Sequence, residues 1–177
     1  MPTRAPVWFQ RFERATRAVN KVFAAAACLC TVSIVLLVLV AVVARIFGTH
    51  ILWPYDIAQF TLVYAVFLAM APALESGHHV IVELFDRVIP RPVRPYVQQF
   101  AAALTIVFGA VFLYQLYRMT SRAFADDRLA VAAIAVPLKW VYIIGPVGIV
   151  QFNLTALAEL GRAQWEAGAD AKATPSH

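Results

Sequence analysis

Four stretches of this chain lack acidic and basic side chains over lengths that can cross a lipid bilayer, and they constrain the fold most. They cover residues 22–44, 57–74, 96–117 and 140–158. A helix needs roughly 20 residues to span about 30 Å of hydrocarbon, and apolar residues from Ile51 onward extend the short second stretch. We therefore predict an all-α integral membrane protein with four transmembrane helices. These helices are expected at residues 22–45, 52–75, 96–118 and 131–158.

The composition agrees with a membrane protein and excludes other classes. Apolar residues make up 62% of the chain and the mean hydropathy is +0.71, whereas soluble domains contain roughly 45–50% apolar residues. The segments outside the four stretches are too short for a separate soluble catalytic domain. The net charge of +5 does not indicate nucleic-acid binding, because the basic residues gather at the ends of the stretches and form no single patch.

The distribution of basic residues predicts the orientation in the membrane. Ten of the 15 Lys and Arg residues lie before the first span, between spans two and three, or after span four. The other five are Arg45, Arg118, Arg122, Arg128 and Lys139. Cytoplasmic loops carry an excess of basic residues, so both termini are predicted to face the cytoplasm. The first span is expected to remain as an anchor, because it is too long for a cleaved signal peptide.

The connecting segments are predicted to lie at the membrane surface. Residues 1–21 are expected to form an amphipathic cytoplasmic segment, with basic side chains suited to anionic lipid on one face. The apolar stripe on the other face consists of Trp8, Phe9, Phe12, Ala15 and Val19. Between spans two and three, apolar side chains recur at one-turn spacing over residues 78–89, which predicts a short interfacial helix ended by prolines. Residues 161–177 are small and polar, so we expect a flexible cytoplasmic tail.

No catalytic, cofactor or metal site is predicted. An ionisable side chain at the centre of a bilayer is costly unless it is paired or functional, and the centres of these spans contain none. His78 and His79 are adjacent, so on a helix they point about 100° apart, and the opposed mid-membrane histidines of a haem-binding bundle are missing. Cys28 and Cys30 point to different helix faces and are expected to be packing residues.

Several residues are candidates for contact with a partner protein or the membrane interface. Asp56 follows Pro54 in the first turn of span two, where a carboxylate complements the helix dipole, although gripping a partner is the alternative. Glu75 lies at the other end of that span, where interfacial solvation is the simpler role. Small residues every four positions on span three would let another helix approach closely. The candidates are Trp53, Asp56, Glu75, His78, His79, Glu83, Leu84, Phe85, Ala101, Thr105 and Gly109.

Two segments resemble a known transporter family. The stretch from Ala73 to Asp86, ALESGHHVIVELFD, with the prolines and arginines of residues 89–95, resembles the segment after span two in the small permease subunit (DctQ type) of tripartite ATP-independent periplasmic (TRAP) transporters. The proline and aromatic pattern of residues 136–142, followed by Pro-Val-Gly at 146–148, is similar to the family's fourth span. Trp53 with Asp56 resembles the tryptophan and acid that open its second span. The resemblance covers about residues 20–160.

This resemblance implies a function that composition and spacing do not. It implies a four-span subunit of the bacterial inner membrane that binds a larger multi-span permease, which carries substrate and sodium. A periplasmic substrate-binding protein would deliver the substrate, usually an organic acid. The small subunit would enlarge the static scaffold for a moving element of the large one. The alternatives are a self-contained small transporter and a cytochrome-like membrane anchor subunit.

Overall fold

The computed structural model is a bundle of four long α-helices. It describes residues 6–85, 94–125 and 137–173, and the side chains of residues 6–76, 99–125 and 137–162. The helices are α1 (Val7–Ile46), α2 (Trp53–Phe85), α3 (Arg94–Ala125) and α4 (Leu138–Ala173). Each contains a segment that is long and apolar enough to cross a membrane. For the described residues, the predicted all-α fold with four helices suited to spanning a membrane is therefore confirmed.

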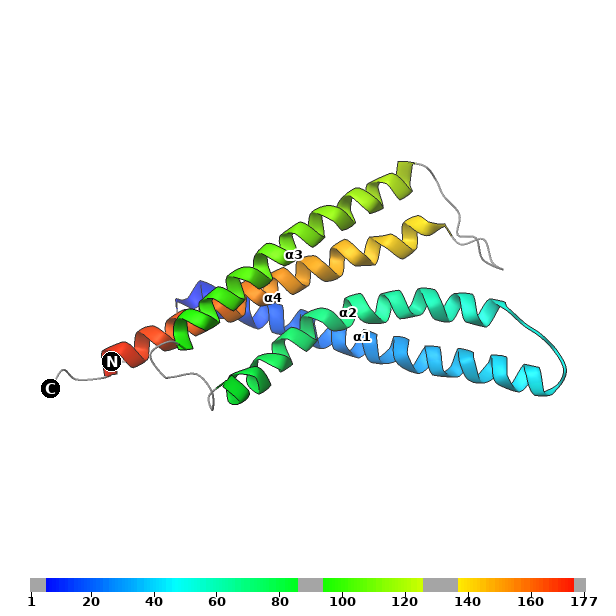
Figure 1. Cartoon of the computed structure of the whole chain (residues 1–177), viewed down its shortest axis with the longest axis horizontal. Helices are drawn as coiled ribbons and strands as arrows, with labels where there is room; N and C mark the ends of the chain where they lie inside the picture. The colour runs from blue at the N-terminus through cyan, green and yellow to red at the C-terminus, as the bar shows by residue number, and fades with distance from the viewer. Residues whose placement is uncertain (1–5, 86–93, 126–136, 174–177) are drawn as a thin grey trace.

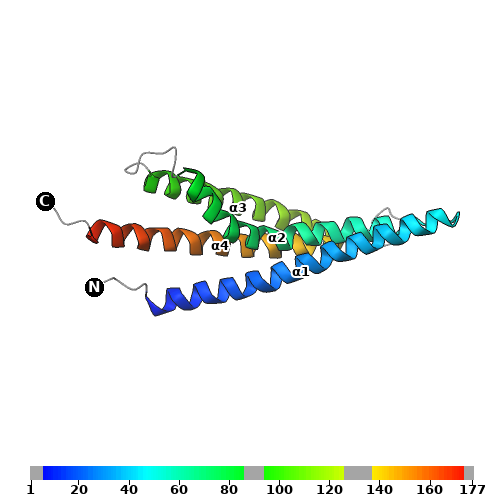
Figure 2. The same ribbon diagram turned by 90° about the horizontal axis from the view of Figure 1, so that it is seen from below.

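The helices run alternately up and down, so both termini lie at the same end of the bundle (Figure 1). We call this the terminal end, and we call the end with residues 47–52 the opposite end. Toward the opposite end, Figure 1 shows the helices in the order α3, α4, α2 and α1, and toward the terminal end α1 crosses behind α4. Figure 2 shows α1 along the lower edge, with α4 between it and α3 at the terminal end. Accordingly, α1 packs on α2, α2 on α4, and α4 on α3, while α1 contacts α4 less extensively.

The first helix is longer than a membrane is thick. At 1.5 Å per residue, its 40 residues extend about 60 Å, roughly twice the hydrocarbon thickness. The sequence predicts a separate amphipathic segment over residues 1–21. In the structure, Val7–Ile46 is one continuous helix, because no proline or glycine interrupts it. Its buried residues in this part are Phe9, Thr16 and Asn20, while Trp8 and Val19 of the predicted apolar stripe are exposed.

A glycine ends this helix at the opposite end. Gly48 has a positive φ of 78°, a conformation that a side chain disfavours. Its amide donates to the carbonyl of Arg45 at 3.1 Å, and the Thr49 amide donates to that of Ala44 at 3.1 Å. These bonds occupy carbonyls that the helix end would leave free, and the chain then turns into α2.

The predicted interfacial helix at residues 78–89 is not supported as a separate element. The second helix continues through Gly77 to Phe85, and residues 86–93 lie outside the described part. A glycine inside a helix costs about 1 kcal/mol relative to alanine but retains its N–H and causes no clash, so Gly77 does not end the helix. Pro72 lies inside α2, which bends along its second half in Figure 1.

The sequence predicts a flexible tail from residue 161, whereas α4 remains helical to Ala173. Gly161 is a packing position, because a β-carbon there would lie 2.5 Å from the ring of Phe9 on α1. The aromatic ring thus occupies the space that a larger side chain would need. This contact with α1 supports α4 at the position where the sequence predicts the start of a flexible tail.

Candidate functional site

A cluster of polar side chains joins three helices near the terminal end. Asn20 of α1 donates from Nδ2 to Glu75 of α2 at 2.7 Å and to the Thr155 hydroxyl of α4 at 3.1 Å. Gln151 of α4 donates from Nε2 to Asn20 Oδ1 at 2.7 Å and to the Thr16 carbonyl at 3.2 Å. We call Thr16, Asn20, Glu75, Gln151 and Thr155 the polar network. All except Glu75 are buried.

The network satisfies its buried groups. The side chain of Asn20 is among the most completely buried in the protein, and an amide without partners is costly in such surroundings. Its donors and its acceptor all have partners, and the Thr155 hydroxyl also bonds the Gln151 carbonyl at 3.0 Å. If one helix shifted relative to the others, these buried polar groups would lose their hydrogen-bond partners, so other arrangements of the helices are disfavoured. The network therefore fixes α1 against α2 and α4.

Charged side chains continue the network toward the termini. Arg17 lies 2.5 Å from Glu13 and 3.9 Å from Glu75, and Arg162 lies 2.6 Å from Glu13 and 3.2 Å from Glu159. The ion pairs connect α1 with both α2 and α4. Glu159 is buried, and its arginine partner offsets part of the cost of that burial. The arrangement is structural, because the described acids and bases here pair with one another and enclose no open site.

Two further polar contacts hold α4 against its neighbours. Pro146 has no N–H, so the carbonyl of Tyr142, four residues earlier, loses its helical partner. The hydroxyl of Thr120 on α3 donates to this carbonyl at 3.2 Å, as hydroxyls do at prolines in membrane helices. On the other side, the Tyr64 hydroxyl of α2 donates to the Trp140 carbonyl at 2.5 Å.

Two glycines permit close approach between helices. A β-carbon on Gly148 of α4 would lie 2.5 Å from the backbone oxygen of Phe67 on α2, so the two backbones could not pack as they do with a larger residue. Gly109 of α3 faces Asn153 of α4, whose amide would clash with a β-carbon at position 109. Small residues that allow backbones to approach are typical of helix contacts in membranes.

The structure places the predicted small residues of α3 in different surroundings. Gly109 is buried against α4, whereas Ala101 is exposed, and the Thr105 hydroxyl bonds the carbonyl of Ala101 in its own helix at 2.9 Å. The close approach at Gly109 is thus an internal contact within this chain. Ala101 and Thr105 remain proposals as partner contacts.

The other candidate residues are scattered along α2. Trp53 is exposed at its start, and Asp56 is half-buried in its first turn. Glu75 alone joins the polar network. The side chains of the remaining five candidates lie outside the described part, although their backbone belongs to α2. Those five are His78, His79, Glu83, Leu84 and Phe85.

The sequence interpretation missed most of the polar network. The prediction considered charged side chains within the spans, and Asn20, Gln151 and Thr155 carry no charge. A usable signal was present, because Thr16 and Asn20, and likewise Gln151 and Thr155, are four residues apart and share a helix face. Polar residues repeated on one face of a membrane helix indicate a helix contact.

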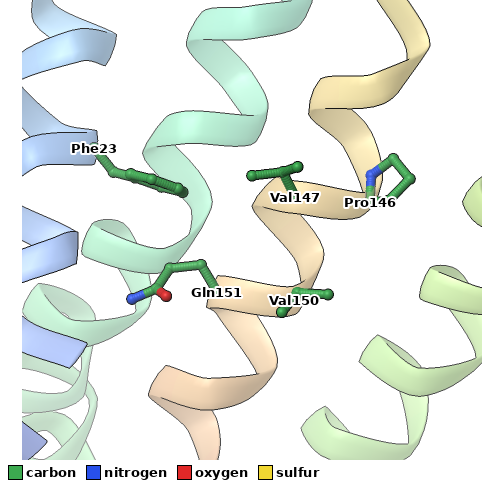
Figure 3. Close-up of a pocket in the computed structure, with 5 residues that line it drawn as sticks. All are labelled: Phe23, Pro146, Val147, Val150 and Gln151. Atoms are coloured by element: carbon green, nitrogen blue, oxygen red, sulfur yellow. The ribbon is translucent and has the colours of Figure 1, made fainter. Parts of the chain in front are cut away.

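A shallow hollow of about 330 Å³ lies beside the network. It is lined by Phe23 of α1 and by Pro146, Val147, Val150 and Gln151 of α4 (Figure 3). The lining is apolar apart from the amide of Gln151, whose nitrogen points toward α1 in Figure 3. Among the described residues, no group of three or more His, Cys, Asp or Glu side chains could hold a metal ion. The hollow therefore has the character of a membrane-facing surface.

The outer faces of α1 and α3 are apolar and largely uncovered. The membrane-spanning part of α3 is the least buried of the four, followed by that of α1. Exposed large side chains on these faces include Leu29, Val32, Leu36, Leu39 and Val43 of α1 and Phe100, Leu104, Val107, Phe108 and Val111 of α3. In a bilayer such faces contact lipid or the helices of another protein.

Comparison with known proteins identifies relatives. The family model for tripartite ATP-independent periplasmic transporters, DctQ component, matches residues 34–164. The sialic acid TRAP transporter permease protein SiaT of Haemophilus influenzae (strain 86-028NP) is 24% identical over 104 residues. That alignment covers 58% of this chain and 16% of the relative. The chain therefore matches only a small part of a much longer protein.

Proposed function

This chain belongs to the DctQ component family of tripartite ATP-independent periplasmic transporters, and on that premise we propose that it is the small membrane subunit of such a transporter. It lies in the bacterial inner membrane and scaffolds a large permease subunit. The large subunit carries the substrate together with sodium, and a periplasmic binding protein delivers that substrate, an organic acid. The small subunit itself transports nothing.

The location of the ionisable side chains is the observation that carries this proposal. The described centres of the four spans contain no acidic or basic residue, whereas binding an ion or an acid within a membrane calls for such groups or for other polar ligands. The polar network lies near the terminal ends of the first two spans and reaches Gln151 near the middle of the fourth. Its buried side chains bond one another. These features favour a passive structural role.

The relative from Haemophilus influenzae supports association with a larger permease. That protein is named as a permease, and the matching segment forms 16% of its length. In that relative, the related segment and a much longer segment belong to one polypeptide. We infer that the present chain binds a separate protein that is equivalent to the longer segment. Its uncovered apolar faces on α1 and α3 offer the surfaces for that contact.

Purification from the native membrane tests the association. The chain, tagged after His177 and expressed at its natural level, is extracted in a mild detergent and isolated. We expect a multi-span membrane protein of the same transporter type to copurify in a fixed ratio. If the chain emerged alone under several mild detergents, and crosslinking in intact membranes captured no larger partner, the scaffold proposal would be wrong.

A further inference from the structure

A second hollow, of about 820 Å³, lies between α3 and α4 near the opposite end of the bundle. Its polar rim includes Arg118 and Arg122 of α3, and its apolar lining includes Phe112 and Leu116 of α3 and Leu138 of α4. The hollow is thus divided into a cationic part and an apolar part. The role proposed above for the chain does not use it.

The two parts lie at different depths in the membrane. Residues 96–117 of the third span carry no charge, and Arg118 is the first charged residue beyond them. Phe112 lies six positions before Arg118, which is about 9 Å along a helix. The arginines are therefore at the level of the lipid headgroups, while Phe112 and Leu116 lie on the hydrocarbon side of them.

Among the described residues, the two arginines have no acidic partner. Arg118 and Arg122 are one helical turn apart, so they share a face, and both are exposed. Within the described residues neither forms an ion pair, whereas Arg17 and Arg162 at the terminal end are both paired with carboxylates. The Arg118 guanidinium lies 5.8 Å from the centre of the Tyr114 ring, a contact that limits its orientation.

The positive charges of Arg118 and Arg122 are unusual for this end of the bundle. Under the predicted orientation these arginines lie outside the cytoplasm, where basic residues are normally fewer. A guanidinium binds phosphate oxygens through paired hydrogen bonds, and basic hollows between membrane helices bind anionic headgroups. A water-soluble acidic protein could reach the arginines but could not reach the apolar lining within the hydrocarbon.

We propose that this hollow binds one anionic phospholipid of the bilayer. The phosphate lies between Arg118 and Arg122, and an acyl chain lies along Phe112 and Leu116. The site needs both parts at once, since the arginines select the negative charge and the apolar lining selects the lipid. It would place an ordered lipid against the outer surface of the α3 and α4 pair.

A lipid titration followed by native mass spectrometry tests the site. The full chain, freed of lipid in a neutral detergent, is titrated with phosphatidylglycerol and, separately, with phosphatidylcholine. We expect one tightly retained phosphatidylglycerol and much weaker phosphatidylcholine binding. Each arginine near an anionic lipid is worth about a fivefold change in affinity. The double variant R118Q/R122Q should therefore lower the phosphatidylglycerol affinity about 25-fold, while R118K/R122K should retain most of it.

Two further variants separate this site from general electrostatic attraction. Arg45 is exposed in the last turn of α1 at the same end of the bundle, so R45Q removes an equal charge outside the hollow and should leave the affinity unchanged. Met119→Trp fills the hollow from an exposed position and should weaken binding with the charges intact. Circular dichroism and thermal unfolding show that each variant retains the fold.

The same titration can overturn the proposal. Equal retention of the two lipids, an unchanged affinity in R118Q/R122Q, or an equal loss in R45Q would each show that the hollow selects no anionic lipid. An unchanged affinity in the Met119→Trp variant would exclude the acyl-chain site. Glycerol 3-phosphate tests a soluble source of phosphate. We expect it not to displace the lipid at millimolar concentration, and displacement would mean that the site binds free phosphate.

Discussion

Replacing Asn20 with leucine should weaken the packing of α1 on α2 and α4. The side chain is 2% exposed, and it bonds Glu75 of α2 and both Thr155 and Gln151 of α4. Leucine has a similar shape but makes none of these three contacts. Among the described residues, Glu75 would keep the more distant Arg17 at 3.9 Å, and Gln151 would keep the Thr16 carbonyl.

The expected loss follows from the number of contacts between helices. A polar contact between membrane helices averages about 0.6 kcal/mol and reaches at most about 1.7 kcal/mol. Three contacts therefore give a loss of about 2 kcal/mol in the free energy of unfolding, or roughly a 30-fold change in the equilibrium constant. A double-mutant cycle of Asn20→Leu with Gln151→Leu should show a coupling of about 0.5–1.7 kcal/mol.

Reversible unfolding of the refolded chain by sodium dodecyl sulfate in mixed micelles provides the measurement. Ser33→Val is the matched control, because this hydroxyl on α1 bonds only the Leu29 carbonyl of its own helix, at 2.9 Å. The control should lie within about 0.5 kcal/mol of the original chain. An Asn20→Leu variant as stable as that control would refute the view that the polar network fixes α1.

Three other outcomes are expected. Gly109→Leu should destabilise the packing of α3 on α4 by about 2 kcal/mol or more, because the leucine side chain would clash with Asn153. The control is Ala103→Leu at an exposed position of the same helix, and equal stability of the two variants would contradict the contact. Thr120→Val should cost about 1 kcal/mol, because the Tyr142 carbonyl loses its donor, and adding Pro146→Ala should remove most of that cost in the same assay. A reporter active only outside the cytoplasm and fused after His177 should give no signal, and activity there would reverse the predicted orientation.

The number of spans was predictable from the sequence, because the charge-free stretches follow directly from the cost of placing charges in hydrocarbon. Helix ends were harder to predict. Gly77 and Gly161 suggested boundaries, but helix α2 continues through the first, and the second packs against Phe9 of α1. A glycine indicates that a side chain is missing, and the sequence does not say whether a turn or a neighbour needs the space.

Part of the polar network was readable from spacing, but its partners were not. Asn20 and Gln151 are separated by 131 positions in the chain, so only the packing of α1 on α4 brings them together. Likewise, the small residue at Gly109 predicted a close approach without showing that Asn153 fills the space. Residues on one helix face can be inferred from periodicity, whereas the opposing helix depends on the whole bundle.

Uptake into proteoliposomes tests the central claim most directly. Vesicles contain either this chain alone or this chain with the large permease of its transporter, under a sodium gradient and with candidate organic acids and their binding protein outside. We predict uptake only when the large permease is present, because the described span centres of this chain hold no charged group that could bind an ion or an acid. Sodium-dependent uptake with this chain as the sole membrane protein would contradict the account.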